Sequence, residues 1–282
     1  MMHTPPIPPI HREPRVITVA NQKGGVGKTT TAINLGTALA AIGEQVAILD
    51  LDSQGNASTG LGIPAKDRGV TSYEVLAGDA SLSEAAQQTA VPNLSIVPST
   101  VDLSSLEMEI AKDPQRAMRL RSALHRYHAD HQAMPDDEKI SYILIDCPPS
   151  LSLLTVNAMA ASHAVLVPLQ CEFFALEGLS QLLRTVEQVR GALNPELIIH
   201  GIALTMYDAR NNLSAQVVED VREVMGDKVY KTMIPRNVRL SEAPGYGRPA
   251  ILYDFKCAGS QAYIKLAQEI IERERELRTV AA

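Results

Sequence analysis

The stretch NQKGGVGKTTT, residues Asn21 to Thr31, lies between an apolar run over 16–20 and an alanine-rich segment that reaches Ile42. A short buried strand, a glycine turn and a helix in that order predict a phosphate-binding loop. Glycines let several backbone N–H groups point inward, and the helix N-terminus adds partial positive charge at the same place. We expect Lys28 to reach the β- and γ-phosphates of a nucleotide, and the Thr29 hydroxyl to bind the accompanying Mg²⁺.

The loop departs from the ordinary pattern G-x-x-x-x-G-K-[ST] at its beginning. It ends as the pattern requires, in Gly27-Lys28-Thr29, but Gln22 replaces the first glycine and a second lysine, Lys23, follows. A lysine there either crowds its own nucleotide or points out of the loop toward another group. The alternative is a solvated lysine in a chance glycine-rich string. It is weaker, because both flanking elements that the motif needs are present.

The 282-residue chain has the composition of a folded globular protein, with 45% hydrophobic and 21% charged residues. Residues 1–15 are rich in proline and lack the apolar core of a signal peptide. We therefore expect a disordered tail, then a domain over 16–277 and a short tail over 278–282. No apolar run is long enough to predict a transmembrane helix. The three cysteines are widely spaced, which favours a reducing cytosol over a disulfide framework or a zinc site.

Net charge is −6, which argues against binding nucleic acid, but the charge is unevenly distributed. Residues 228–265 hold only two acidic side chains, Glu242 and Asp254, and seven basic ones: Lys228, Lys231, Arg236, Arg239, Arg248, Lys256 and Lys265. A basic surface on an acidic protein is compatible with binding a phosphate backbone. An ordinary solvated surface has a similar composition, so both interpretations stay open.

Apolar runs alternate with helix-like segments along the chain. Seven runs are predicted as strands, at 16–20, 45–52, 94–98, 142–146, 164–170, 198–206 and 229–234. Helices are expected up to Ile42, near 72–76 and 82–86, over 103–127 with a break at Asp113-Pro114, up to Ala192, and over 217–225 and 260–277. This alternation predicts an α/β fold, a single P-loop NTPase domain. Its twisted, mainly parallel sheet should have about seven or eight strands, with helices on both faces.

Two of the predicted strands end in acidic residues. Asp50 and Asp52 follow one apolar run, and Asp146 ends another, YILID. Open parallel sheets bind ligands at the carboxyl ends of their strands. The second run is typical of a Walker B strand, whose aspartate helps to hold Mg²⁺ through its water shell. Structural alternatives exist, in which Asp50 is a strand-end acid with a structural partner and Asp146 is a capping residue.

Three histidines, His125, His128 and His131, recur at helical spacing near the middle of the chain. A metal site is conceivable there, but the stretch is polar and precedes Pro135-Asp136-Asp137. We interpret it as an exposed surface loop.

The string KGGVGKTT, Lys23 to Thr30, resembles the deviant Walker A box of the ParA/MinD group of P-loop ATPases, which includes the nitrogenase iron protein. Further strings follow in family order. DSQGN from Asp52 is similar to the family's DPQGN, with Ser53 in place of proline, and DCPP from Asp146 is similar to its DxPP box. CEFFALEG from Cys171 is typical of the chromosomal, Soj-like branch. The resemblance covers about Val16 to Ile271.

The resemblance implies ATP and Mg²⁺ as cofactors and a slow, partner-stimulated ATP hydrolysis. Lys23 would cross the interface of a face-to-face homodimer and touch the partner's nucleotide. Asp52 would orient the attacking water and sense the γ-phosphate, with Lys23 and Lys28 as the other catalytic residues. The loop contacts to ATP would come from Lys23, Gly24, Gly25, Val26, Gly27, Lys28, Thr29 and Thr30. The metal would be held by Thr29, Asp52 and Asp146.

More distant contacts follow from the same resemblance. Glu172 would approach the ribose of the opposing nucleotide, although an N-capping role at the next helix is equally physical. Met206, Pro235 and Asn237 would lie near the adenine ring. Arg210 and Arg239 match arginines that bind double-stranded DNA without sequence preference, with surface salt bridges as the alternative.

The resemblance therefore implies a cytoplasmic, nucleoid-associated ATPase that partitions DNA. ATP would induce the dimer and its DNA binding, and hydrolysis stimulated by a ParB-type centromere-binding protein would release the DNA. A MinD-like membrane-associated regulator is the main alternative. The charged end over 272–278 lacks the large apolar residues of a membrane-docking helix, so no membrane partner is expected. An electron carrier like the nitrogenase iron protein needs two cysteines in each subunit to hold an iron–sulfur cluster. Cys147 and Cys171 do not lie where that family's ligands would. A metabolic kinase on the same fold is also compatible with a P-loop.

Overall fold

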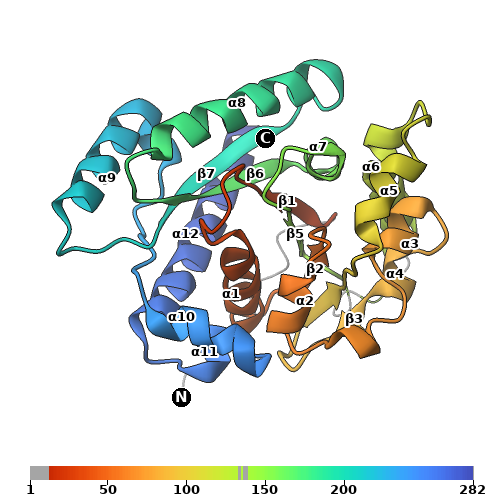
Figure 1. Ribbon diagram of the computed structural model, residues 1–282, viewed down its shortest axis with the longest axis horizontal. Coiled ribbons are helices and arrows are strands. Elements are labelled where there is room, and N and C mark those ends of the chain that lie inside the picture. The colour runs from red at the N-terminus through yellow and green to blue at the C-terminus, as the bar shows by residue number, and fades with distance from the viewer. Residues whose placement is uncertain (1–12, 133–134, 136–138, 282) are drawn as a thin grey trace.

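A seven-stranded sheet crosses the computed structural model in the order β3-β4-β2-β5-β1-β6-β7 (Figure 1). The structure describes residues 13–132, 135 and 139–281, so the predicted tail lies outside the described residues except at its end. All neighbouring strands are parallel except β3, which is antiparallel to β4. The strands are β1 Arg15–Val19, β2 Val46–Asp50, β3 Gln87–Gln88, β4 Leu94–Val97, β5 Tyr142–Asp146, β6 Ala164–Gln170 and β7 Ile198–Thr205.

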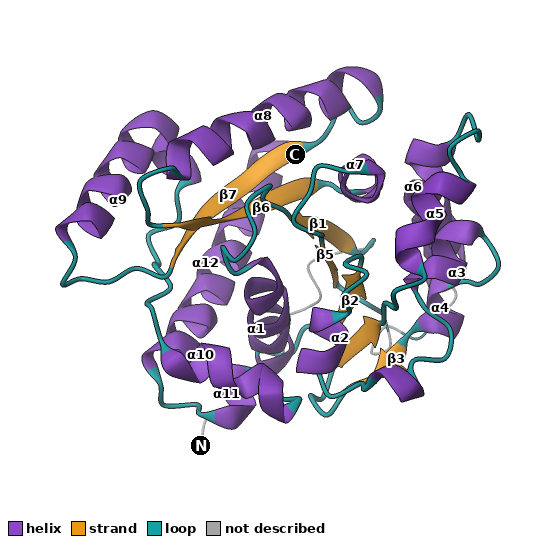
Figure 2. Cartoon of the chain, viewed as in Figure 1, coloured by secondary structure: helices purple, strands orange, loops and turns teal. Residues whose placement is uncertain are grey.

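Helices cover both faces of this sheet (Figure 2). One face carries α3 Ser72–Ala77, α4 Leu82–Ala85, α5 Leu103–Glu109, α6 Arg119–His131, α7 Leu153–Ala161, α8 Ala175–Ala192 and α9 Asn212–Met225. The other carries α1 Lys28–Ala41, α2 Asn56–Gly60, α10 Val238–Glu242, α11 Ala250–Tyr253 and α12 Ala258–Ala281. Short 3₁₀ turns lie at η1 Ala65–Asp67, η2 Arg116–Met118, η3 Gly226–Lys228 and η4 Ala243–Tyr246. The α/β fold with a mainly parallel sheet is confirmed.

The central strand β5 shows why two layers of helices are needed. Its side chains alternate between the faces, so Ile143 and Ile145 join the core under α6 and α7, while Tyr142 and Leu144 join the core under α1 and α12. All four are almost completely buried. A parallel strand buried on both faces reads as a continuous apolar run, which is how the sequence predicted it.

The predicted strand over 229–234 is wrong. The segment makes one bridge to β7, between Ile202 and Val229, and no ladder. Its next backbone donors are taken elsewhere, because the N–H groups of Lys231 and Thr232 donate to the Glu269 carboxylate on α12, at 2.7 and 3.0 Å. The seventh strand is instead the two-residue β3, which has too few residues to show a period in the sequence.

The predicted histidine loop is wrong in its first half. Helix α6 continues to His131, beyond the buried residues Ala123, Leu124 and Tyr127 that hold it against the core. Among the described residues, no group of three or more His, Cys, Asp or Glu side chains is arranged to hold a metal ion.

The first strand begins earlier and the last helix ends later than the ranges predicted for them. β1 begins at Arg15, which pairs in register with Tyr142, and the Arg15 guanidinium donates to Glu274 of α12 at 2.8 Å. α12 continues to Ala281.

Candidate nucleotide-binding site

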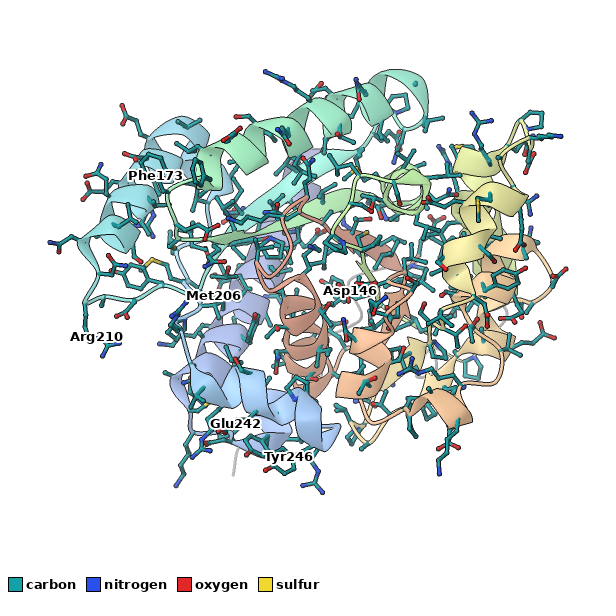
Figure 3. All side chains as sticks on the ribbon, in the orientation of Figure 1. Asp146, Phe173, Met206, Arg210, Glu242 and Tyr246 are labelled. Carbon is teal, nitrogen blue, oxygen red and sulfur yellow. The ribbon has the colours of Figure 1, made fainter. Side chains whose placement is uncertain are left out.

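The parallel strands bring the predicted phosphate loop and the acidic residues to one edge of the sheet. Register places Val19, the last residue of β1, beside Asp146 of β5, and Asp146 beside Asp50 of β2. The loop from Asn21 to Gly27 leaves β1 at this edge and enters α1. In Figure 3, Asp146 is labelled near the middle of the molecule, close to α1.

Two glycines shape the phosphate loop. Gly25 has φ 76° and Gly27 has φ 89°, a left-handed backbone that other residues adopt at a cost. Gly27 caps α1 without a side-chain hydrogen bond. Between the two glycines, Val26 is buried and its carbonyl accepts a bond from the Thr205 hydroxyl at 2.9 Å. This bond ties the loop to the end of β7. The N–H groups at the start of α1 are therefore held in place for an anion.

Lys28 is almost completely buried inside its own loop. Its Nζ donates to the backbone carbonyl of Lys23 at 2.9 Å. Burial lowers the pKa of the Lys28 ammonium, and the nearby charge of Asp146 opposes that shift. The carbonyl is neutral, so the buried ammonium keeps its positive charge. It can therefore bind a negatively charged phosphate group strongly.

Asp146 carries a completely buried carboxylate. Neither of its side-chain oxygens has a hydrogen-bond partner among the described residues. Burial raises its pKa well above the ordinary value, and the charge of Asp50 adds to the rise. Unpartnered buried carboxylates are costly, and a hydrated divalent cation would satisfy this one. Together with Thr29 and Asp52 it forms an all-oxygen donor set that fits Mg²⁺.

Asp50 is bonded within the fold. Its Oδ2 accepts from the backbone N–H and the hydroxyl of Ser58, at 3.0 and 2.7 Å, and its Oδ1 accepts from the N–H of Asp52 at 3.1 Å. Burial raises the pKa of Asp50 to about 6. These bonds agree with the structural interpretation of Asp50, in which it is an acid at a strand end with a structural partner. Asp52 is also buried, and its own carboxylate accepts from the Gln54 N–H at 3.0 Å.

A cavity of about 350 Å³ opens beside the phosphate loop. The three residues predicted near an adenine ring, Met206, Pro235 and Asn237, all line it together with Gly27 and Thr30. Met206 has φ 52°, a backbone conformation that is strained for a non-glycine residue. Residues in such conformations are concentrated at binding sites. The structure thus brings these residues together next to the loop, and Figure 3 labels Met206 there.

Glu172 pairs with Lys23 at the outer side of the loop. The predicted capping role is not observed, since α8 begins after Phe174 without any side-chain cap. The ring pair Phe173 and Phe174 follows at once, edge to face with centroids 5.1 Å apart. Both rings are largely exposed, and Phe173 projects near α8 and α9 in Figure 3. Sequence reasoning gave these rings no separate role, although two aromatic residues after a strand end were a visible signal.

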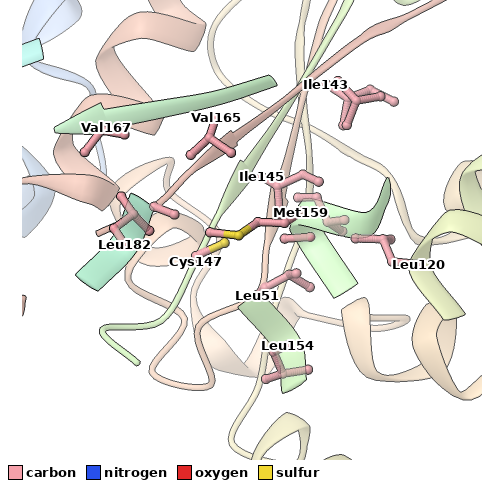
Figure 4. Close-up of a cluster of buried hydrophobic side chains, with 14 of the residues drawn as sticks. Leu51, Leu120, Ile143, Ile145, Cys147, Leu154, Met159, Val165, Val167 and Leu182 are labelled. Carbon is pink, nitrogen blue, oxygen red and sulfur yellow. The ribbon is translucent and has the colours of Figure 1, made fainter. Parts of the chain in front are cut away.

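Cys147 belongs to the apolar core rather than to a metal centre. Figure 4 shows it among Leu51, Met159 and Leu182. Burial raises the pKa of its thiol, and the neighbouring Asp146 charge adds to the rise, which disfavours the thiolate that a metal needs.

The two arginines proposed for DNA contacts lie at the surface in ion pairs. Arg210 is 89% exposed and binds Asp208 through two nitrogens, each bond 2.9 Å long. Arg239 pairs with Glu242 at 2.8 Å and with Asp254 at 3.5 Å. The salt-bridge alternative therefore describes their contacts in the isolated protomer. Exposed pairs of this kind contribute little stability, so a phosphate can replace the carboxylate.

The C-terminal helix α12 is partnered within the fold. Tyr263, Leu266 and Ile270 are buried in the core that it shares with α1. Within the described part of the chain, no helix combines the length and apolar character that crossing a bilayer requires.

Comparisons with known proteins agree with this geometry. A family model described as an AAA domain matches residues 14–199. The chain is 60% identical to "Chromosome partitioning protein ParA" of Caulobacter vibrioides, over 95% of this chain and 98% of that protein. It is 50% identical to "Sporulation initiation inhibitor protein Soj" of Bacillus subtilis, over 91% and 98%. Its fold is similar to that of cobyrinic acid a,c-diamide synthase from Mycobacterium smegmatis with bound ATP analogue and magnesium. That similarity has a TM-score of 0.78 at 36% identity, over 90% of this chain and 93% of that one.

Proposed function

Because this chain belongs to the ParA/Soj family of chromosome-partitioning ATPases, we propose that ATP switches it into a homodimer that binds DNA without sequence preference. The chain is an ATPase. A ParB-type centromere-binding protein would stimulate hydrolysis, and hydrolysis would dissolve the dimer. The proposed place of action is the cytoplasm, on the nucleoid.

The observation that best supports nucleotide and Mg²⁺ binding is the buried Asp146 carboxylate beside the phosphate loop, which has no hydrogen-bond partner among the described residues. Lys28 is expected to turn from the Lys23 carbonyl to the β- and γ-phosphates, and the N–H groups at the start of α1 bind the same phosphates. Thr29, Asp52 and Asp146 would hold Mg²⁺. When bound, this ion would neutralise charge that develops on the phosphate oxygens.

The proposed chemical step needs an oriented water molecule. Asp52 is buried close to the end of β2, and its carboxylate accepts a hydrogen bond from the Gln54 N–H. We propose that it orients the attacking water and senses the γ-phosphate. The cavity lined by Met206, Pro235 and Asn237 is proposed to hold the adenine ring. A site of this volume, partly apolar and next to the phosphate loop, suits a nucleotide base.

The dimer is proposed from Lys23 and Glu172. Lys23 belongs to the phosphate loop, and its side chain pairs with Glu172 on the exposed side of the loop, where a second copy could bring its own nucleotide. The γ-phosphate would be the group that distinguishes the two states, because a ligand shifts an equilibrium only by its differential affinity. DNA binding is proposed for Arg210 and Arg239, which are both exposed, and Arg239 lies in the basic segment 228–265.

A membrane-associated regulator of the MinD type is the second candidate, and α12 argues against it. The apolar side of α12 is buried against α1 as far as Ile271, so it is not free to dock on a bilayer.

Molar mass in solution tests the proposal. Light scattering with no nucleotide, with Mg–ADP and with Mg–ATP should give one protomer mass in the first two states and twice that mass only with ATP. An unchanged mass in all three states would contradict a dimer controlled by ATP.

A further inference from the structure

Arg68 binds four groups on the segments that surround the Asp52 loop. It follows η1, and its Nη1 donates to the Ser99 carbonyl at 2.8 Å, beyond the end of β4. Nη2 donates to the Gly55 carbonyl at 3.1 Å and to the Thr59 hydroxyl at 2.7 Å. Nε donates to the Ile63 carbonyl at 3.1 Å. One guanidinium group therefore connects both ends of α2 to the segment that follows β4.

The backbone at Gly55 is shaped to receive this side chain. Gly55 has φ 61°, and a Cβ atom there would lie 2.0 Å from Arg68 Nη1 and 2.9 Å from the Ser99 carbonyl oxygen. Any larger residue would displace the guanidinium from its position. The glycine thus serves the left-handed turn and the close approach of Arg68 at once.

A second set of bonds holds the same segment from inside the protein. The Ser58 hydroxyl donates to Asp50 at 2.7 Å and accepts from the Ser99 N–H at 3.1 Å. Ser99 is therefore bound twice, by Ser58 through its N–H and by Arg68 through its carbonyl. The turn that carries Asp52 begins at this buried anchor and ends at Gly55, whose N–H donates to the Asp52 carbonyl at 2.8 Å.

We propose that Arg68 is a positioning residue for ATP hydrolysis. It holds the turn from Asp52 to Gly55 in one conformation, so that the Asp52 carboxylate keeps a single direction toward the phosphate loop. The proposal rests on the proposed role of Asp52. Misplacement of a reacting group by about 1 Å can cost roughly 10²-fold in rate. Removing Arg68 should therefore slow the chemical step while the phosphate loop, which it does not touch, keeps its affinity for ATP.

Lysine cannot replace Arg68 in this role. A guanidinium presents five N–H donors in a rigid plane, whereas an ammonium is a single point on a flexible stem. Arg68→Lys keeps the charge but cannot reach Ser99, Gly55 and Ile63 at once. The lysine variant therefore separates a positional effect from an effect of charge.

Single-turnover hydrolysis and nucleotide affinity, measured on the full chain with Mg–ATP, test the proposal. Arg68→Ala and Arg68→Lys should each lower the rate by between about ten- and a hundred-fold, with Kd for Mg–ATP changed less than about twofold. Guanidinium ions at millimolar concentration should restore part of the rate to Arg68→Ala and none to Asp52→Ala.

Arg119→Ala is the matched control. Arg119 also donates to backbone carbonyls, of Leu76 and Ala77, but it lies on α6 and these acceptors belong to α3 rather than to α2 or the Asp52 turn. This variant should lose thermal stability and keep its hydrolysis rate.

A normal rate in Arg68→Lys and Arg68→Ala would overturn the proposal, as would a loss of rate matched by an equal loss of ATP affinity. If Arg68→Ala does not fold, Arg68→Lys decides alone. Normal hydrolysis by Asp52→Ala would refute the role of Asp52 itself, a different failure.

Discussion

Lys23 and Glu172 form an ion pair across the outer side of the phosphate loop, although 149 residues separate them in the chain. Lys23 is 42% exposed and Glu172 is 29% exposed. Each therefore satisfies the other's charge in the protomer while staying accessible from outside. A partner's nucleotide approaching this side would compete for both side chains, so the pair is expected to open when the dimer forms.

Replacing Lys23 by alanine should weaken the dimer more than nucleotide binding. The alanine removes the cation proposed to touch the partner's phosphates, while Lys28 and the loop backbone stay in place. We expect at least a tenfold weaker ATP-dependent dimer, about 1.4 kcal/mol, in light-scattering titrations. Lys112→Ala, at an exposed lysine distant in sequence from the loop, is the control. An equal dimer affinity in the two variants would argue that Lys23 is only a solvated loop residue.

Replacing Asp52 by alanine should block hydrolysis and preserve the ATP-bound dimer. Orienting the attacking water contributes roughly 10²- to 10⁴-fold to a rate, so phosphate release should fall by at least the lower figure. The phosphate loop is untouched, and light scattering should find a dimer that persists for as long as ATP is present. Turnover at the normal rate would move the catalytic role to another residue.

Replacing Arg239 by glutamate should weaken DNA binding equally on any sequence. Each lost phosphate contact lowers the slope of log Kd against log salt by about 0.9. Arg190→Glu is a close control, because Arg190 on α8 is also exposed and also pairs with a glutamate three residues away. Fluorescence anisotropy with two unrelated duplexes measures both effects. A loss confined to one sequence, or the same loss in the control, would contradict a phosphate contact by Arg239.

The buried Asp50 should make the stability of the protein fall as pH rises through the acid range. Its pKa of about 6 in the folded state exceeds the value of about 4 expected for an unfolded aspartate. Between these values the unfolded state loses its proton first, so deprotonation favours unfolding. The contribution is roughly 3 kcal/mol between pH 4 and pH 6. Urea unfolding without Mg²⁺ should show a steeper fall for the natural chain than for Asp50→Asn. Parallel slopes would contradict the raised pKa.

The phosphate loop was predictable because all of its requirements are local. A strand, a glycine turn and a helix follow one another within about thirty residues, and each has its own pattern in the sequence. The acids at the ends of β2 and β5 were predictable for a related reason. Parallel strands bring their carboxyl ends to the same edge, so Asp50 and Asp146 were expected at one edge of the sheet. Their direct pairing follows from the observed strand order, in which β2 is next to β5.

Other parts of the site depend on long-range contacts that no local pattern encodes. Arg68 binds mainly backbone carbonyls, and a carbonyl acceptor has no signature in the sequence. The segment over 229–234 has the apolar pattern of a strand. The N–H groups of Lys231 and Thr232 in its middle nevertheless donate to Glu269, which lies more than thirty residues further along the chain. The strand prediction failed there because tertiary contacts outweighed local propensity.

The central claim is that ATP controls DNA binding, and the affinity for a random-sequence duplex in each nucleotide state tests it most directly. The titrations would be made without nucleotide, with Mg–ADP and with Mg–ATP, each across a salt series. Tight binding only with Mg–ATP, weakening steadily as salt rises, is the predicted result. Equal affinity in all three states, or no binding in any of them, would contradict the claim and leave an ATPase whose nucleotide serves another partner.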